Sequence, residues 1–375
     1  MVDLALRMLM HDRLRFFITV SGVAFAVNLI LSQVGLFFGL LSNSSIVVRN
    51  IPAEIWVTSK NTPNVDFAQA FPEAYVNRVR SVPGVARADN LIVTFLNINL
   101  PNGATEGTVT YAVEDFQAWN LPWKLESGDI RDLRRGNFMF TDASAVRRIG
   151  AFEAGDYREV SGVRMRYAGR SVGATSFTTT PVSFMDYRLA QRMNSNLLEG
   201  NTTYILVKAA PGADIKALKA EIQRRLPHND VYTRAEWAQR SDDYWIKNTG
   251  IGLNAYITVA LGILVGVVIV AQTLYTSTME HIKEFGTVKA IGGSNADIYR
   301  LLGRQALVAA VVGFTIGALL TLAMKPGVAA IGLRLILPAP VWITVALGTL
   351  VMCLLSAGVS FRKVANIDPG LVFRS

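Results

Sequence analysis

Residues 16–42 of this 375-residue chain read FFITVSGVAFAVNLILSQVGLFFGLLS and contain no Asp, Glu, Lys or Arg. An uncharged apolar run of about 18 residues or more is long enough to cross a lipid bilayer as an α-helix. Three further uncharged runs meet this criterion, at residues 249–279, 305–324 and 338–361. The sequence therefore predicts four transmembrane helices.

The composition agrees with a membrane protein. The chain is 51% hydrophobic and 17% charged and has a mean hydropathy of +0.32, whereas an average soluble domain contains about 25% charged residues. This composition argues against a wholly soluble enzyme. Basic residues next to a span mark its cytoplasmic side, and Arg7, Arg13 and Arg15 lie before or at the start of the first span. We therefore expect both chain ends on the cytoplasmic side after four crossings.

A long polar stretch separates the first two spans. Residues 43–248 hold 25 Lys and Arg and 22 Asp and Glu, so they carry only +3 of the net charge of +9. Helix and strand patterns alternate at residues 72–100 and 203–232, and short β-like runs fill residues 115–185. We expect an α-helical membrane protein with four transmembrane helices and an α+β extracytoplasmic domain between helices 1 and 2, in which residues 115–185 form an inserted subdomain.

The remaining segments follow from the same patterns. Residues 1–15 mix apolar and basic side chains, which favours an amphipathic helix on the cytoplasmic membrane surface; a helical extension of the first span is the alternative. The predicted order is 1–15 amphipathic helix, 16–42 first span, 43–248 external domain, 249–279 second span, 280–304 cytoplasmic helix and connector, 305–324 third span, 325–337 external loop, 338–361 fourth span and 362–375 cytoplasmic tail.

The sequence lacks the motifs of common enzymes. It contains no GxxxxGK[ST] loop for nucleotide phosphates and no HExxH, CxxC or GxSxG pattern, and its three histidines lie far apart. We therefore expect a non-catalytic chain with no catalytic residue, no metal site and no cofactor of its own. The spans contain no acidic or basic side chain, which argues against a proton- or ion-coupled carrier.

An enzyme built on external carboxylates is a weak alternative. Asp242 and Asp243 are adjacent, but they just precede the second span and lack a nucleophile and base arrangement. We expect this pair on a solvated juxtamembrane face, with Tyr244 and Trp245 at the membrane interface.

Glycines recur at helical spacing in three of the spans. The GxxxG spacing lets two helix backbones approach closely. It occurs as Gly35 with Gly39, Gly262 with Gly266, and Gly313 with Gly317. Helix packing within one chain and dimerisation between two chains are both compatible with this pattern.

The most informative segment follows the second span and reads EHIKEFGTVKAIGGSN from Glu280 to Asn295. Glu280 and Glu284 are four residues apart, so they share one face of a helix. Phe285 adds an apolar side chain, and Gly286 permits a sharp turn or the close approach of another backbone. The pattern is typical of a docking element; a solvated connector is the alternative.

This segment resembles the E-x-x-x-E-[IF]-G-x-[LV]-[KR]-A-[IL]-G-[AG]-[ST] signature of the MacB/FtsX-type ABC transporter permeases. The order of one span, a large external domain and three further spans is also similar to that family. Asp368, Pro369 and Arg374 match the usual C-terminal pattern of the family. Within the family, the segment is most similar to DevC-like permeases of exporters that work with a membrane fusion protein.

The resemblance implies a role for the segment. In the family it is the coupling helix, which seats in a groove of the ATPase subunit. The residues that match this role are Glu280, Lys283, Glu284, Phe285, Gly286, Ala290, Ile291 and Gly292. The resemblance also implies a MacB-like periplasmic domain in the external part and a location in the bacterial cytoplasmic (inner) membrane.

The family also implies partners and a mechanism. We expect a homodimer that binds a separate ABC ATPase, which carries ATP and magnesium, and that contacts membrane lipid, with a periplasmic membrane fusion protein as a candidate outer partner and no nucleic acid. The implied mechanism is mechanotransmission for export or extraction of an amphiphile such as a lipid, glycolipid, lipoprotein or peptide. The alternative is a transmembrane regulator that relays the motion of the ATPase to an envelope enzyme such as a cell-wall hydrolase.

Overall fold

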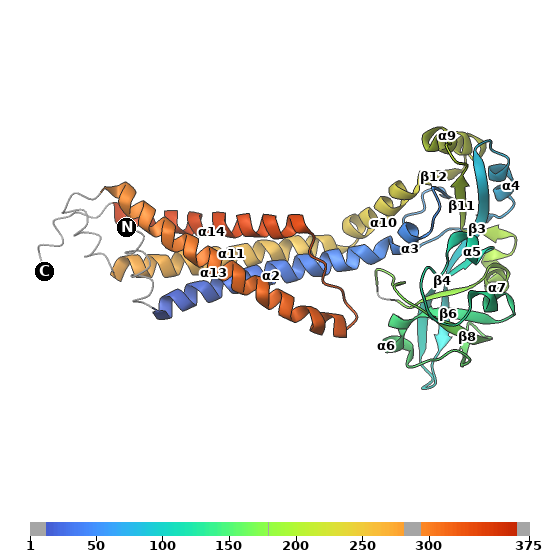
Figure 1. Cartoon of the computed structure of the whole chain (residues 1–375), viewed down its shortest axis with the longest axis horizontal. Coiled ribbons are helices and arrows are strands. Elements are labelled where there is room, and N and C mark those ends of the chain that lie inside the picture. The colour runs from blue at the N-terminus through green and yellow to red at the C-terminus, as the bar shows by residue number, and fades with distance from the viewer. Residues whose placement is uncertain (1–12, 179, 281–293, 366–375) are drawn as a thin grey trace, which may run out of the picture. The chain divides into compact units, whose positions relative to one another are not determined.

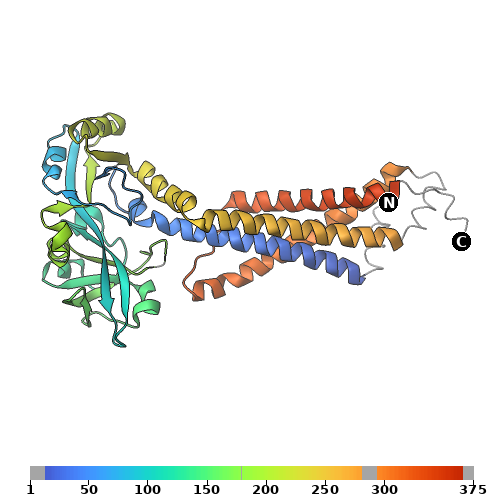
Figure 2. The ribbon, with the colours of Figure 1, turned by 180° about the vertical axis from the view of Figure 1, so that it is seen from behind.

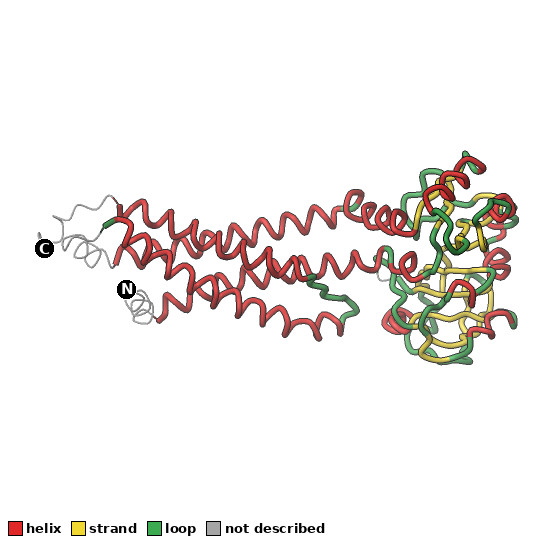
Figure 3. Tube along the Cα trace, turned by 45° about the horizontal axis from the view of Figure 1, so that its top comes forward, coloured by secondary structure: helices red, strands yellow, loops and turns green. Residues whose placement is uncertain are grey.

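The chain folds into two compact units (Figure 1). The computed structural model describes residues 13–178, 180–280 and 294–365. One unit, the helical unit, combines the chain up to Gly39 with the chain from Ile251 onward. The other, the sheet unit, runs from Leu40 to Gly250 and contains the strands that Figure 3 draws in yellow.

Four long helices lie side by side in the helical unit, as the front and rear views show (Figures 1 and 2). They are α2 (Arg13–Ser44), α11 (Gly250–Glu280), α13 (Asn295–Ala330) and α14 (Ala339–Ala365). Each contains a stretch long and apolar enough to cross a membrane, which confirms the predicted four membrane helices. Residues 1–12, most of the predicted amphipathic helix, and residues 366–375 of the predicted tail lie outside the described residues.

One buried apolar cluster holds these helices together. It contains Val23 and Leu31 of α2, Val270 of α11, Ala310 of α13 and Met352 of α14. Large apolar side chains elsewhere on the helices are exposed, among them Leu261, Leu264, Val311, Leu319 and Leu355. Lipid tails are as apolar as leucine, so helices of a membrane protein can present such side chains outward.

Helix α13 extends beyond the predicted third span at both ends. Its N-terminus is a capping box, in which Ser294 Oγ accepts the N–H of Asp297 (3.3 Å) and the Asp297 carboxylate accepts the N–H of Ser294 (3.1 Å). At its other end the helix continues through Pro326. The uncharged run underestimates the length of α13, because a charged residue ends such a run without ending the helix. Helical structure therefore occupies parts of the predicted segments 280–304 and 325–337.

Ten strands of the described residues form one sheet in the sheet unit. Their order is β12-β1-β11-β3-β4-β9-β6-β8-β5, and β7 pairs with β3 and β8. Their bounds are β1 Ile55–Ser59, β3 Val85–Asn99, β4 Thr105–Val113, β5 Leu125–Ser127, β6 Phe138–Asp142, β7 Tyr157–Val160, β8 Val163–Ser171, β9 Val182–Asp186, β11 Tyr204–Ala209 and β12 Asn229–Thr233. A separate pair joins β2 (Phe71–Pro72) to β10 (Asn201–Thr202).

Helices cover both faces of this sheet. They are α3 (Ile46–Asn50), α4 (Tyr75–Arg80), α5 (Phe116–Trp119), η1 (Ile130–Arg134), η2 (Ala143–Ala145), α6 (Val146–Ile149), α7 (Tyr187–Met193), α8 (Ser195–Leu198), α9 (Ile215–Arg225) and α10 (Arg234–Asn248). Successive strand residues point to opposite faces. In β1, Val57 therefore joins the apolar cluster that includes Leu218 of α9, whereas Trp56 joins the cluster that includes Trp237 of α10.

The predicted α/β patterns are confirmed. The helix and strand expected at residues 72–100 are α4 and β3, and the strand, helix and strand expected at 203–232 are β11, α9 and β12. We call β1, β11, β12, α4 and α9 the α/β lobe. Each helix of this lobe lies between strands of the sheet in sequence, as the change of periodicity from 3.6 to 2 predicts.

The stretch 115–185 supplies β5 to β9 but does not form a sheet of its own. Strand β9 pairs in parallel with β4, with Val109 opposite Val182, and β7 pairs with β3, with Ile98 opposite Val160. We call β5 to β9 with α7 the β lobe. Because β3 is 15 residues long and runs through both lobes, the expectation of a separate inserted subdomain is corrected to two lobes of one continuous sheet.

Candidate functional site

The predicted coupling segment lies between two membrane helices. Glu280 is the last residue of α11, and its carboxylate forms an ion pair with Arg15 near the start of α2. The other matched residues lie outside the described residues, namely Lys283, Glu284, Phe285, Gly286, Ala290, Ile291 and Gly292. The capping box at Ser294 marks where α13 begins. The structure thus places both ends of the segment, and its docking role stays a prediction.

The six glycines at GxxxG spacing contact other parts of the same helical unit. A Cβ added at Gly39 would lie 1.7 Å from the carbonyl oxygen of Arg334, and one added at Gly317 would lie 2.6 Å from that of Ala24. The nearest side chains to a Cβ at the other four are Leu335 for Gly35, Ile30 for Gly262, Met352 for Gly266 and Val23 for Gly313. These contacts occur within one chain: Gly262, Gly266, Gly313 and Gly317 meet other helices, whereas Gly35 and Gly39 meet the connection between α13 and α14. A role of these glycines in dimerisation stays a prediction.

A polar joint ties the segment after the first span to α10, the helix that precedes the second span. The carboxylate of Asp242 accepts a hydrogen bond from Ser44 Oγ at the end of α2. It also forms an ion pair with Arg49 of α3, with a distance of 2.8 Å between Nη2 and Oδ2. Arg49 Nε donates in turn to Ser45 Oγ at 2.9 Å. We call Ser44, Ser45, Arg49 and Asp242 the juxtamembrane joint.

The two adjacent aspartates thus have different surroundings. Asp242 belongs to the joint, whereas Asp243 pairs with Lys247 one turn along α10 at 2.9 Å. The expected interfacial position of Trp245 is wrong. Its ring is 7% exposed and stacks on Phe177 within the sheet unit, with ring centroids 4.1 Å apart. A stacking partner far away in sequence gives the indole an apolar environment without lipid.

The loop before β2 is fastened to the inner face of α10. Ser241 Oγ accepts the N–H of Val65 at 3.2 Å. The next residue, Asp66, is buried, and the Tyr111 hydroxyl donates to its carboxylate at 3.0 Å. Burial disfavours the charged carboxylate and raises its pKa to about 6, although the hydrogen bond from Tyr111 opposes this shift. This part of the external domain therefore contains a carboxyl group that titrates near neutral pH.

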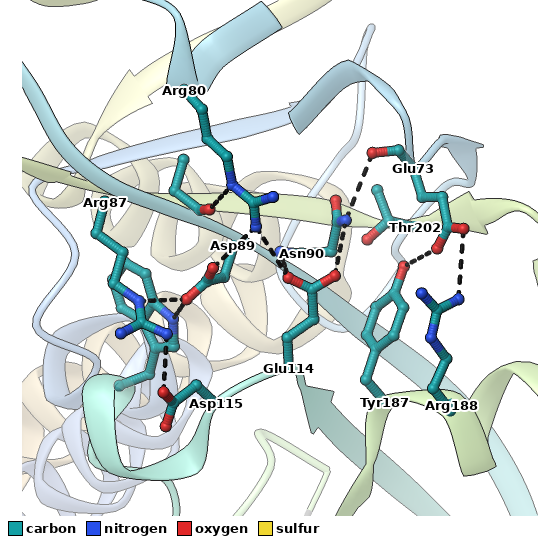
Figure 4. Close-up of polar contacts among 12 residues, drawn as sticks. Glu73, Arg80, Arg87, Asp89, Asn90, Glu114, Asp115, Tyr187, Arg188 and Thr202 are labelled. Carbon is teal, nitrogen blue, oxygen red and sulfur yellow. Dashed lines mark hydrogen bonds and ion pairs between the residues drawn. The ribbon is translucent and has the colours of Figure 1, made fainter. Parts of the chain in front are cut away.

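A charged network lies where the two lobes meet (Figure 4). Its centre is Asp89 of β3, which accepts hydrogen bonds from Arg80 Nη2 (3.0 Å), Arg87 Nε (2.5 Å) and Trp119 Nε1 (2.8 Å). Arg87 also binds Asp115 at 2.8 Å. Partial burial opposes ionisation of Asp115, but hydrogen bonds from the N–H of Ala118 and from Arg87 hold its pKa below the usual range.

Glu73 connects this region to α7 of the β lobe. Its carboxylate accepts a hydrogen bond from Tyr187 Oη at 3.0 Å and lies 3.5 Å from Arg188 (Figure 4). It also accepts a hydrogen bond from Gln191 Nε2 at 2.8 Å. Its carbonyl oxygen accepts from Asn90 of β3 at 3.4 Å. Glu73 thus fastens the segment before α4 to both lobes.

Sequence patterns did not identify the joint or the network. Asp242 and Ser44 are separated by 198 positions, and no periodicity links residues at that distance. The one local signal is the run Asn43, Ser44 and Ser45, which follows the first uncharged stretch directly. Small polar residues at the end of an apolar helix commonly satisfy its last carbonyl groups, and here Ser44 Oγ also lies 2.7 Å from the carbonyl oxygen of Leu41.

Two solved structures are similar to the external part of the chain. The extracellular domain of the noncanonic ABC-type transporter YknZ from Gram-positive bacteria has 13% sequence identity and a TM-score of 0.37, covering 48% of this chain and 98% of that structure. The periplasmic region of MacB from Actinobacillus actinomycetemcomitans has 12% identity and a TM-score of 0.39, covering 51% and 94%.

Two relatives align along nearly the whole chain. An uncharacterized ABC transporter permease of Mycobacterium bovis is 24% identical over 363 residues, which covers 96% of this chain and 95% of the relative. An uncharacterized ABC transporter permease of Mycobacterium tuberculosis is 24% identical over 380 residues, which covers 100% of this chain and 99% of the relative.

Two protein families match successive parts of the chain. The MacB-like periplasmic core domain matches residues 16–225, more than half of the sequence, and the FtsX-like permease C-terminal domain matches residues 256–369. The first match contains α2 and most of the sheet unit, and the second contains the three later membrane helices. The chain therefore belongs to the MacB/FtsX-type permeases of ABC transporters, as the segment beginning at Glu280 predicted.

Proposed function

We propose that this multi-pass permease transmits ATP-driven motion from a separate ATPase subunit to its external domain, where the motion drives export or extraction of an amphiphilic substrate. The juxtamembrane joint is the observation that carries the proposal. A single carboxylate, that of Asp242, binds the residues after the first span and belongs to the helix before the second span. A displacement of either span is thus passed to the same point of the external domain.

The composition of the spans supports transmission of force over passage of a charged solute. The uncharged runs 16–42, 249–279, 305–324 and 338–361 contain no acidic or basic side chain. A carrier that couples transport to protons or ions keeps such groups at membrane depth. Apolar helices that pack through glycines and small side chains instead form a stiff bundle.

The ATPase would dock on residues 280–292, at the cytoplasmic side of the bacterial inner membrane, with both chain ends on that side. ATP and magnesium would bind to the ATPase and not to this chain. ABC ATPases work as pairs, so a homodimer of the permease gives each ATPase one coupling segment. A periplasmic membrane fusion protein is the candidate outer partner, and a lipid, glycolipid, lipoprotein or peptide the candidate cargo.

Co-purification of the tagged chain in mild detergent tests this proposal. The wild type is expected to recover an ABC ATPase in near-equal amount. Glu284→Lys is expected to lose the ATPase because it reverses a charge on the docking segment. Glu199→Lys, which makes the same charge change on the external domain, is the matched control and should retain it.

Equal recovery of the ATPase with Glu284→Lys and with the control would overturn the docking role. Absence of any ATPase from stable, monodisperse wild-type protein would overturn the larger proposal. Recovery of the ATPase together with a cell-wall hydrolase would replace export by the regulator, in which the same motion controls an envelope enzyme.

A further inference from the structure

An aromatic row crosses the sheet unit from its interior to its surface. Trp245 stacks on Phe177 with ring centroids 4.1 Å apart, and the Phe67 ring lies 5.9 Å from Trp245. Phe67 in turn stacks on Phe95 at 6.2 Å with 29° between the ring planes. Phe177 and Trp245 are 3% and 7% exposed, whereas Phe67 and Phe95 are 41% and 49% exposed. The row thus has a buried, fixed end and an open end.

The open end has the properties of a binding surface. Two phenylalanines that stack face to face while both remain exposed present a flat apolar area to their surroundings. Aromatic side chains contribute large contact areas and lose little conformational entropy when a ligand covers them. The tilted contact with the Trp245 ring also holds Phe67 in place before any ligand arrives, which lowers the entropic cost of binding.

Beside the row lies an open cavity of about 570 Å³ with charged side chains in its lining. It is lined by α10 from Glu236 to Asn248 and by Asn61 and Pro63. Tyr244 belongs to both features, because it lines the cavity and its ring meets Phe67 edge to face at 5.8 Å. An apolar surface and this cavity therefore adjoin at one side chain.

Of the charged side chains that line the cavity, Arg240 lacks an ion-pair partner among the described residues. Lys247 pairs with Asp243 at 2.9 Å, and Glu236 pairs with Lys219 at 2.7 Å. Arg240 has no acidic partner among the described residues; its Nε donates to the carbonyl of Thr62 at 3.2 Å, and its guanidinium lies 5.4 Å from the centre of the Tyr232 ring. The Arg240 guanidinium can therefore bind a ligand group that carries negative charge.

We propose that this site binds one anionic phospholipid molecule, with an acyl chain on Phe67 and Phe95 and the phosphate-bearing headgroup in the cavity near Arg240. A lipid is the occupant because the site lies close along the chain to a membrane helix. Tyr244 is six positions before Gly250, where α11 begins, and six residues of chain reach at most about 20 Å. The site thus combines an apolar surface for an acyl chain with a cation for a phosphate.

This inference deepens the proposed function by naming a lipid as a bound amphiphile. It rests on that function only for the role of the bound lipid as a substrate. The binding itself needs no ATPase. A permease that binds the lipid without transmitting motion, or that transmits motion without binding the lipid, would separate the two proposals.

Photo-crosslinking of the full chain tests the site. The purified protein is illuminated with lysophosphatidylglycerol that carries a diazirine in its acyl chain, and labelled peptides are identified by mass spectrometry. Labels are expected in the segments around Phe67, Phe95 and Tyr244. The double variant Phe67→Ser, Phe95→Ser should reduce this labelling about tenfold, since both apolar surfaces that would contact the acyl chain are removed. Tyr157→Ser, which removes another exposed ring of the sheet unit, is the control.

The headgroup is tested with Arg240→Gln and with zwitterionic lysophosphatidylcholine carrying the same acyl chain. The wild type should label more strongly with the anionic lipid, Arg240→Gln should lose this preference, and Arg240→Lys should retain it because the charge is kept. Labelling confined to the membrane helices, or equal loss in the Phe double variant and in Tyr157→Ser, would overturn the site. Equal labelling by the two lipids in the wild type would overturn the anionic headgroup.

Discussion

Arg49 of α3 holds Asp242 of α10, with Nη2 of the arginine 2.8 Å from Oδ2 of the aspartate. Ser44 Oγ donates to the other carboxylate oxygen. The arginine side chain is 61% exposed and the aspartate 16%, so water screens the charges and the pair contributes modestly to stability. Its importance lies in where it is, between the chain that leaves one span and the helix that enters the next.

Asp242→Ala is therefore expected to affect coupling more than folding. Loss of the carboxylate removes both contacts and should lower the free energy of unfolding by about 1 kcal/mol, while ATP-driven work by the assembled transporter should fall strongly. Thermal unfolding and ATP-dependent substrate release would be measured on the same preparation. Asp132→Ala, which removes the surface pair with Arg135 far along the chain from the joint, serves as the control. Equal activity of the two variants would show that the joint does not transmit motion.

Helix packing at the glycines is tested with Gly317→Ala. A Cβ at this position would lie 2.6 Å from the carbonyl oxygen of Ala24 and 2.8 Å from Cβ of Val27, so α2 and α13 must separate, at a cost of about 1 to 3 kcal/mol. Gly348→Ala in α14 is the matched control, because nothing lies within 4 Å of its added Cβ. Thermal unfolding in detergent should show a lower midpoint for Gly317→Ala only. Similar midpoints for the two variants would contradict the packing.

Asp66 gives the external domain a defined pH dependence. Its pKa is raised to about 6 by burial, so between its unfolded and folded pKa values the folded state binds more protons than the unfolded state. Stability therefore decreases as the pH rises through 6. A shift of about two units corresponds to a cost of at most about 3 kcal/mol at pH 8.

Asp66→Asn removes this titration and keeps an oxygen that can accept from Tyr111. The variant is expected to be more stable than the wild type at pH 8, and its advantage should shrink as the pH falls from 7 to 4. Unfolding would be followed at each pH for both proteins, so that other titrating groups cancel in the difference. A difference that stays constant over this range would exclude a raised pKa for Asp66.

Glu73→Gln tests whether the two lobes move together. The variant loses the charge and one acceptor oxygen that serve Tyr187, Gln191 and Arg188 of α7. Backbone amides of α7 should exchange with deuterium about tenfold faster, which corresponds to about 1.4 kcal/mol of lost local stability. Glu221→Gln, whose arginine partners lie within α9, is the control. Unchanged exchange in α7 would mean that the lobes are held by the sheet alone.

The sequence predicts what is local and periodic. Four uncharged runs predict four membrane helices, because length and hydropathy suffice for such a helix. Helix α9 is also predicted, because its apolar residues recur at helical spacing after Asp214, whose carboxylate caps the first turn. The segment from Glu280 predicts the family through fixed spacing of acidic residues and glycines.

Long-range pairings are not predicted. The contact of Ser44 with Asp242, the stacking of Trp245 on Phe177 and the parallel pairing of β4 with β9 each join segments that are distant in sequence. The secondary-structure propensity of a segment is the same whether its distant partner is present or absent. The juxtamembrane joint and the aromatic row therefore become visible only when the chain is folded.

Strand β3 is shared by both lobes of the external domain: Ala88 belongs to the core of the α/β lobe, whereas Leu96 and Ile98 belong to that of the β lobe. The β lobe therefore cannot be exchanged between relatives as an independent unit. A chimera that replaced residues 115–185 with those of a relative would join a foreign half-sheet to the native edges of β3 and β4. Transfer of the whole lobe between relatives would therefore require both strands to move with it.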